Sequence, residues 1–204
     1  MIFLLNRCLV RLSRKIIMKT TLLEPGKYYH IYNQAKNGDP LFGDEEAFRF
    51  FLRLYRSHIA PVADTFAYCL LKDHLHLLVR IKRDVNGSIY KPFALLFNAY
   101  AKGFNKHNGK EGKVFRFKLK RIEIRRESYF FEMVRYINQN ARKHGVAEED
   151  SQYRFSSFRA SLTPGPSIVC KEELAKYFCN GRNLAQNLSA EVDEKSIKMF
   201  MLEN

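Results

Sequence analysis

The sequence predicts a mixed α+β fold, built from a strand hairpin and several amphipathic helices. Residues 74–79 alternate with the period of two that is typical of a β-strand, and the turn Lys72-Asp73 joins them to a second strand at 65–71. A third strand signal covers residues 27–34. Apolar residues recur at helical spacing in three further segments, at 44–58, 92–107 and 127–144. Separate strands and helices of this kind are typical of the α+β class.

The first two helices have recognisable ends. Asp44 is a residue type that caps helix N-termini, and Glu45 and Glu46 suit the helix dipole in the first turn. The second helix is predicted to stop at Asn108-Gly109.

The third helix is predicted to run unbroken over residues 127–144, with Gly145 as its C′ residue. Its core face is made of Phe130, Val134, Ile137 and Ala141. On a second stripe, Tyr136 and Asn140 are four residues apart, which places them one turn apart on the same side. Three polar residues are expected to point elsewhere: Arg135, Gln139 and Lys143.

Composition points to one globular domain with a polyanionic partner. The chain has 204 residues, 46% of them hydrophobic, and a formal net charge of +14. A surplus of this size most often reflects nucleic-acid binding, and the alternatives are a ribosome-associated protein or a basic domain without such a partner. No stretch is long enough to span a membrane. We therefore expect a cytoplasmic protein, and the absence of a C-x-x-C pair fits reduced thiols there.

The first residues are expected to lie outside the folded domain. Their apolar run is interrupted by Arg7 and Arg11, which argues against a signal peptide. We expect Met18 to be the natural start. The predicted division is an N-terminal segment over 1–24, a domain over 25–160 and a C-terminal helical extension over 161–204.

A candidate metal site lies on the hairpin strand. The period of two places His74 and His76 on one face, while Leu75, Leu77 and Val79 take the other and can enter a core. Neutral imidazoles held on a strand are good ligands for a divalent cation. The alternative is a half-exposed strand face with no ligand.

Basic residues alternate with aromatic ones between the second and third helices. A strand or loop of this composition suits a nucleic-acid backbone with bases stacked on the rings. The alternative is a solvated edge strand with a few core aromatics. The candidate DNA-binding residues are Lys113, Arg116, Lys118, Lys120, Arg121 and Arg125.

Together these features suggest phosphodiester chemistry. The Asn140 side-chain oxygen can complete a cation site with His74 and His76, and the Tyr136 oxygen can attack phosphorus. The alternative for Tyr136 is a surface or core aromatic. A zinc hydrolase is a further alternative, but its only nearby carboxylate, Asp73, is expected to point to the other face.

Several segments resemble motifs of the single-tyrosine transposases of the HUH endonuclease superfamily and follow one another in the same order as in that family. The resemblance is greatest to the branch associated with repetitive extragenic palindromes (REP). The resemblance covers about 28–160 and rests on residues 29–33 (YHIYN), 42–44 (FGD), 73–79 (DHLHLLV), 111–118 (EGKVFRFK), 135–140 (RYINQN) and 155–158 (FSSF). The chain departs from the family at Ala141, where a proline is frequent, and at Lys72-Asp73 before the first histidine.

The resemblance implies a ferredoxin-like antiparallel sheet with helices packed on it. It also implies His74, His76 and Asn140 as ligands of Mg²⁺ or Mn²⁺, and Tyr136 as the nucleophile. The implied reaction cleaves and rejoins single-stranded or hairpin DNA through a 5′-phosphotyrosine in a nucleoid-associated bacterial protein. The alternative is a domesticated member that binds structured nucleic acid without cleaving it. Whether the protein forms a homodimer is left open.

Overall fold

The computed structural model describes residues 22–198 except 37, 39 and 179–182. Its core elements follow the order βαββαβ: β1 (Tyr28–Gln34), α2 (Glu45–His58), β2 (Ala63–Leu70), β3 (His74–Ile81), α3 (Tyr90–Asn108) and β4 (Lys120–Ile124). The later elements are α4 (Glu127–Asn138), α5 (Asn140–Lys143), η1 (Asp150–Gln152), α6 (Ser157–Leu162), α7 (Lys171–Phe178), α8 (Leu184–Leu188) and α9 (Glu194–Ile197). The expectations about Met18 and residues 1–21 lie outside the described residues.

The four strands form one antiparallel sheet in the order β2-β3-β1-β4. This is the ferredoxin-like arrangement, so the predicted α+β fold is confirmed. In the β1–β3 register, Tyr32 lies opposite His76 and Gln34 lies opposite His74. Because opposed residues on antiparallel strands share a face, β1 and β3 present one common polar strip.

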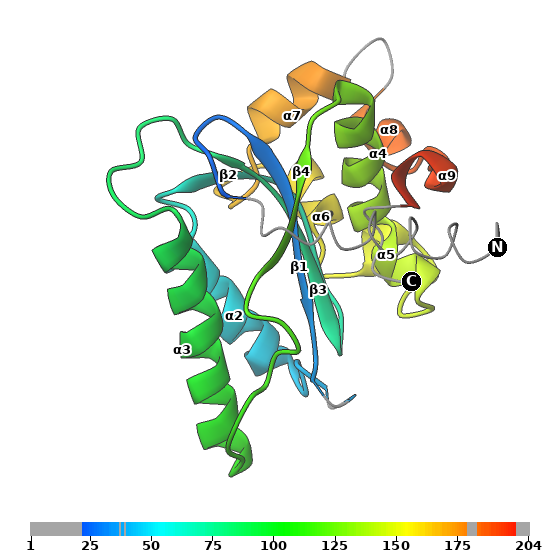
Figure 1. The fold of residues 1–204 in the computed structure, drawn as a ribbon. Helices are drawn as coiled ribbons and strands as arrows, with labels where there is room; N and C mark the ends of the chain where they lie inside the picture. The colour runs from blue at the N-terminus through cyan, green and yellow to red at the C-terminus, as the bar shows by residue number, and fades with distance from the viewer. Residues whose placement is uncertain (1–21, 37, 39, 179–182, 199–204) are drawn as a thin grey trace, which may run out of the picture.

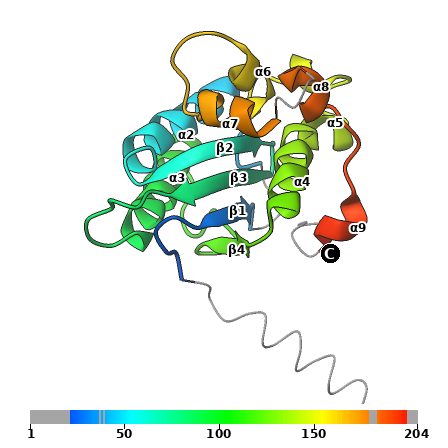
Figure 2. The same cartoon turned by 90° about the horizontal axis from the view of Figure 1, so that it is seen from above.

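Helices cover both faces of the sheet. Figure 2 shows α2 and α3 on one side of the strands and α4 on the other. Residues Leu75, Leu77 and Val79 are buried, as the alternation predicts. Asp44 caps α2 by accepting a hydrogen bond from the Ala47 N–H at 2.8 Å, which confirms the predicted helix start.

The predicted helix over 127–144 is wrong in one respect, because it divides at Gln139 into α4 and α5. The Asn138 amide donates to the carbonyl of Val134 at 2.8 Å and so competes with regular helical bonding. The Gln139 amide donates to the carbonyls of Leu188 and Ala190, each at 2.8 Å. Gly145 follows α5 with φ of 65°, as predicted for a C′ glycine.

The C-terminal helices pack on the sheet and on α4 (Figure 1). Arg80 on β3 forms an ion pair with Glu173 on α7 and another with Asp64 on β2 at 2.7 Å. Arg135 on α4 donates to the carbonyl of Asn187 at 3.0 Å. In the described part of the chain, no helix combines the length and apolar character needed to cross a bilayer.

Candidate active site on the histidine strand

His74 and His76 lie on the sheet face that α4 and α5 cover. Their ring centroids are 5.2 Å apart and the ring planes are perpendicular. His74 is 9% exposed and His76 is fully buried. The alternative of a half-exposed strand face is therefore wrong.

Each histidine forms a hydrogen bond through its Nδ1 atom. His74 Nδ1 lies 2.8 Å from a carboxylate oxygen of Asp73, and His76 Nδ1 lies 2.9 Å from Nε2 of His30. The expectation that Asp73 points to the other face is wrong, because Asp73 precedes β3 and strand alternation does not apply to it. Asp73 is thus engaged by His74 rather than placed as a separate general base.

Tyr136 projects from α4 toward His76. The two ring centroids are 5.7 Å apart, the ring planes are nearly perpendicular, and Tyr136 is fully buried. Tyr136 is thus a core aromatic, as the alternative expects, but it also contacts a candidate metal ligand of its own chain. Lys143 does not point elsewhere as predicted, because its Nζ lies 4.9 Å from the centroid of the Tyr136 ring.

Asn140 begins α5, one turn after Tyr136, and is fully buried. His144, at the end of the same turn, packs edge-on against His74 with ring centroids 4.7 Å apart. α5 therefore lies over the histidine strand. The sequence pattern missed His30 and His144, since their positions depend on the strand register and on the fold of α5.

The His76 environment favours a neutral ring. Burial lowers the pKa of His76 well below its ordinary value, and the nearby His30, His74 and His144 lower it further. A neutral imidazole keeps one nitrogen lone pair, which is the form that binds a metal.

The residues present fit a divalent cation. Among the described residues, His76 Nε2 and both polar side-chain atoms of Asn140 are buried with no hydrogen-bond partner. Leaving such atoms unsatisfied costs about 1–3 kcal/mol each. In the same part of the chain, no three His, Cys, Asp or Glu side chains are grouped to hold a metal. The candidate set of His74, His76 and Asn140 is not a group of that kind, because its third ligand is the side-chain amide of Asn140.

The predicted basic residues divide between the two faces of the sheet. Lys120 lies opposite Tyr32 on β1, which lies opposite His76 on β3, so the three residues form one row across the sheet. Arg121 takes the other face, where its guanidinium stacks on Tyr90 of α3 at 5.6 Å.

Of the other basic residues, Lys113, Arg116 and Lys118 precede β4 on its Lys120 side, and Arg125 follows the opposite end of the strand. Lys120 and Arg116 both stack on the ring of Phe117, at 4.7 and 5.4 Å. Lys113, Arg116 and Lys118 are exposed. Arg125 is exposed as well and pairs with Glu123 at 3.1 Å. β4 is an edge strand, as the alternative expects, and its Lys120 end leads toward the histidines.

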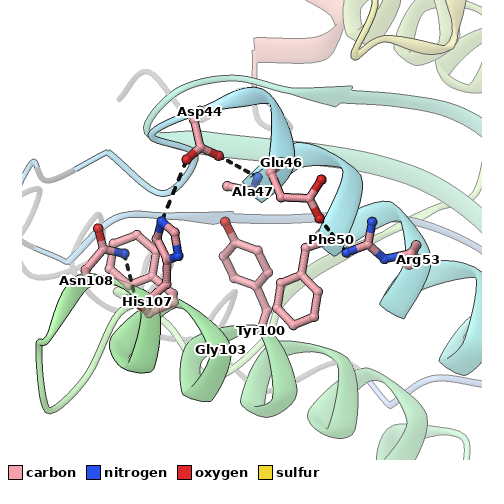
Figure 3. A pocket seen from close by; sticks show the side chains of 10 residues that line it. Asp44, Glu46, Ala47, Phe50, Arg53, Tyr100, Gly103, His107 and Asn108 are labelled. Atoms are coloured by element: carbon pink, nitrogen blue, oxygen red, sulfur yellow. Dashed lines mark hydrogen bonds and ion pairs between the residues drawn. The ribbon is translucent and has the colours of Figure 1, made fainter.

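A separate hollow of about 230 Å³ lies between α2 and α3. Figure 3 shows Phe50 and Tyr100 forming its wall, with Asp44 and His107 facing each other at one end. These helices cover the opposite sheet face, so the hollow is distinct from the histidine site.

The structure resembles a solved nucleic-acid enzyme. A REP-associated tyrosine transposase bound to a REP hairpin matches with a TM-score of 0.55 and 17% identity, over 73% of this chain and 91% of that one. A bacterial tRNA(His) guanylyltransferase-like protein in complex with GTP matches with a TM-score of 0.40 and 7% identity, over 70% and 77% of the chains. No protein-family model matches the chain, and no curated protein matches its sequence. The chain therefore has the α+β fold of a tyrosine transposase, as its sequence motifs predict.

Proposed function

We propose that the protein is a metal-dependent DNA transposase that cleaves and rejoins single-stranded or hairpin DNA through Tyr136. One observation carries the proposal most directly: Tyr136 packs against His76, whose buried Nε2 has no hydrogen-bond partner among the described residues. Asn140 supplies a second unsatisfied group one turn from the tyrosine. A nucleophile beside such ligands suits phosphoryl transfer.

DNA as the partner is supported by charge and by fold. The net charge is +14, and the row from Lys120 through Tyr32 to His76 connects the basic segment with the histidines. The structural neighbour is described bound to a REP hairpin. We infer that the DNA backbone follows Lys113, Arg116 and Lys118 toward Lys120 and that bases stack near Phe117.

In the proposed reaction, the Tyr136 oxygen attacks phosphorus and the bond from phosphorus to the 3′ oxygen breaks. The phenol gives up its proton, and the departing 3′ oxygen takes one up. The products are a 5′-phosphotyrosine and a free 3′-OH, and attack by a 3′-OH reverses the step without ATP. Lys143, 4.9 Å above the ring, can balance the charge of the phenolate. Mg²⁺ or Mn²⁺ held by His74, His76 and Asn140 would polarise the phosphate as a Lewis acid.

Access to the site requires movement. His76, Tyr136 and Asn140 are each fully buried, so a phosphodiester cannot touch them in this arrangement. Lys143 covers the tyrosine ring and pairs with Glu194 on α9. DNA binding must therefore displace α5, or break the ion pair by which Glu194 of α9 holds Lys143 of α5.

The same burial favours a second candidate, a protein that binds structured DNA without cleaving it. Both candidates predict salt-sensitive DNA binding. They differ in whether a covalent protein–DNA adduct forms.

The test uses hairpin oligonucleotides from the gene's own flanks, labelled at the 5′ or the 3′ end and incubated with Mn²⁺ or Mg²⁺. A 5′-phosphotyrosine predicts a protein band on a denaturing gel that carries the 3′ label only and disappears with EDTA. Tyr136→Phe should reduce the adduct by about 10³-fold or more, because the nucleophilic oxygen is lost. Tyr129→Phe, on the same helix, is the matched control and should retain it.

A gel shift without a covalent band, across several hairpins and both metals, would favour the binding-only candidate. An adduct that persists in Tyr136→Phe would place the nucleophile elsewhere.

A further inference from the structure

We propose that Asp73 and His30 are positioning residues that hold His74 and His76 as Nδ1–H tautomers, so that each Nε2 lone pair would be available to the cation. The inference rests on the proposed function. Neither residue is among the proposed metal ligands, so each would act only through the histidine it contacts.

The contact between His30 and His76 allows the His76 proton two positions, and only one of them leaves Nε2 available to a metal. A neutral imidazole carries one N–H, on either Nδ1 or Nε2. A proton on Nε2 would leave a buried donor without an acceptor among the described residues. A proton on Nδ1 is donated to His30 Nε2 over 2.9 Å. The second arrangement satisfies the His76 donor, places the proton of neutral His30 on its Nδ1, and leaves the His76 Nε2 lone pair for a metal.

The argument for His74 is independent and rests on Asp73. An ionised carboxylate only accepts hydrogen bonds, so His74 Nδ1, 2.8 Å from Asp73 Oδ1, must carry the proton. In the neutral form of His74, the lone pair therefore resides on Nε2. A carboxylate partner also makes the other ring nitrogen more basic.

The two contacts thus select the same tautomer in two rings that lie 5.2 Å apart. Hydrogen bonds of this kind orient metal-binding histidines, and removing one typically lowers metal affinity by about 10–100-fold. Asp73 and His30 come from different parts of the fold, the β2–β3 turn and β1. The proposal therefore predicts Nδ1–H tautomers in the metal-free protein.

Asp73→Ala is the cleanest test, because the Asp73 side chain is 61% exposed and its removal should leave folding intact. Mn²⁺ titration of the DNA-free full chain, followed by electron paramagnetic resonance, should show about 10–100-fold weaker binding. Asp73→Asn keeps an accepting oxygen and should restore most of the affinity. His30→Phe should weaken binding similarly, and His30→Gln, which keeps an acceptor, should restore part of it.

His107→Ala and Asp84→Ala remove the same chemical groups at exposed positions and should leave Mn²⁺ binding unchanged. Equal losses in Asp73→Asn and Asp73→Ala would overturn the positioning role of Asp73. Equal losses in His30→Gln and His30→Phe would do the same for His30.

A second measurement needs no metal. Long-range ¹H–¹⁵N spectra of the metal-free protein should show His74 and His76 as Nδ1–H tautomers, and Asp73→Ala should release this preference at His74 alone. Nε2–H tautomers in the wild type would overturn the inference. Wild-type protein with the expected tautomers but no Mn²⁺ binding would support the hydrogen-bond assignment and overturn the metal site of the proposed function.

Discussion

The two faces of the sheet are packed in different ways. On the α2–α3 face, buried polar groups have partners: the Tyr55 hydroxyl bonds Thr65 at 2.7 Å, and the Tyr100 hydroxyl donates to the carbonyl of Leu41 at 2.5 Å. On the α4–α5 face, His76 Nε2 and the Asn140 amide are buried without a partner among the described residues. Unsatisfied buried groups destabilise a fold, so their presence on one face alone supports the ligand site proposed there.

The comparison predicts that the first face supports stability and the second supports chemistry. The following changes test it, beginning with the largest expected effect.

Phe51→Ala should disrupt the packing on the α2–α3 face and so destabilise the protein. Phe51 is fully buried and lies 5.3 Å from Tyr100 and 5.6 Å from Phe42, measured between ring centroids. Replacing it removes a buried ring and leaves a cavity, which should lower the free energy of unfolding by about 3–5 kcal/mol. Urea denaturation would measure the loss. Mn²⁺ affinity of the folded fraction should not change, and a parallel loss of affinity would contradict the division between the faces.

Acid should lower the free energy of unfolding through His76, on the α4–α5 face. Its pKa in the folded protein lies well below the ordinary 6.5, so below pH 6.5 the unfolded chain binds a proton that the folded chain does not. The stability that His76 contributes is therefore present above pH 6.5 and lost as the pH falls. The slope should approach about 1.4 kcal/mol per pH unit.

Urea titrations of metal-free protein between pH 7.5 and 5.5 would measure this slope. His76→Gln should flatten it, and the exposed His107→Gln should not. An unchanged slope in His76→Gln would show that other groups cause the acid sensitivity.

Asn140→Leu should separate stability from function. Leucine has a similar size and removes two buried polar atoms that have no partner among the described residues. The free energy of unfolding should stay the same or rise by about 1 kcal/mol, while Mn²⁺ binding and DNA cleavage are lost. A clear loss of stability in this variant would mean that the Asn140 amide already has a stabilising role in the fold.

Local patterns in the sequence predict much of this arrangement. The alternation around His74 and His76 predicts β3, and the Asp44 cap predicts the start of α2, because both signals come from neighbouring residues. The spacing of Tyr136 and Asn140 predicts that they lie one turn apart, although the helix divides at Gln139 between them.

Other features depend on contacts between distant residues. The break at Gln139 accompanies side-chain bonds to Leu188 and Ala190, about fifty residues away. The contact from His30 to His76 needs the β1–β3 register, which alternation alone does not set. The separation of Lys120 from Arg121 follows from the β4 register and could not be seen in a list of charges.

The central claim is that Tyr136 becomes covalently attached to DNA, and mass spectrometry of the adduct tests it most directly. The adduct formed with Mn²⁺ would be digested with nuclease and trypsin. Cleavage after Arg135 and Arg142 yields a peptide over 136–142 whose only tyrosine is Tyr136. The account predicts a nucleotide phosphate on this peptide, at the tyrosine. A nucleotide on a different tyrosine, or an unmodified 136–142 peptide in an adduct-containing sample, would contradict it.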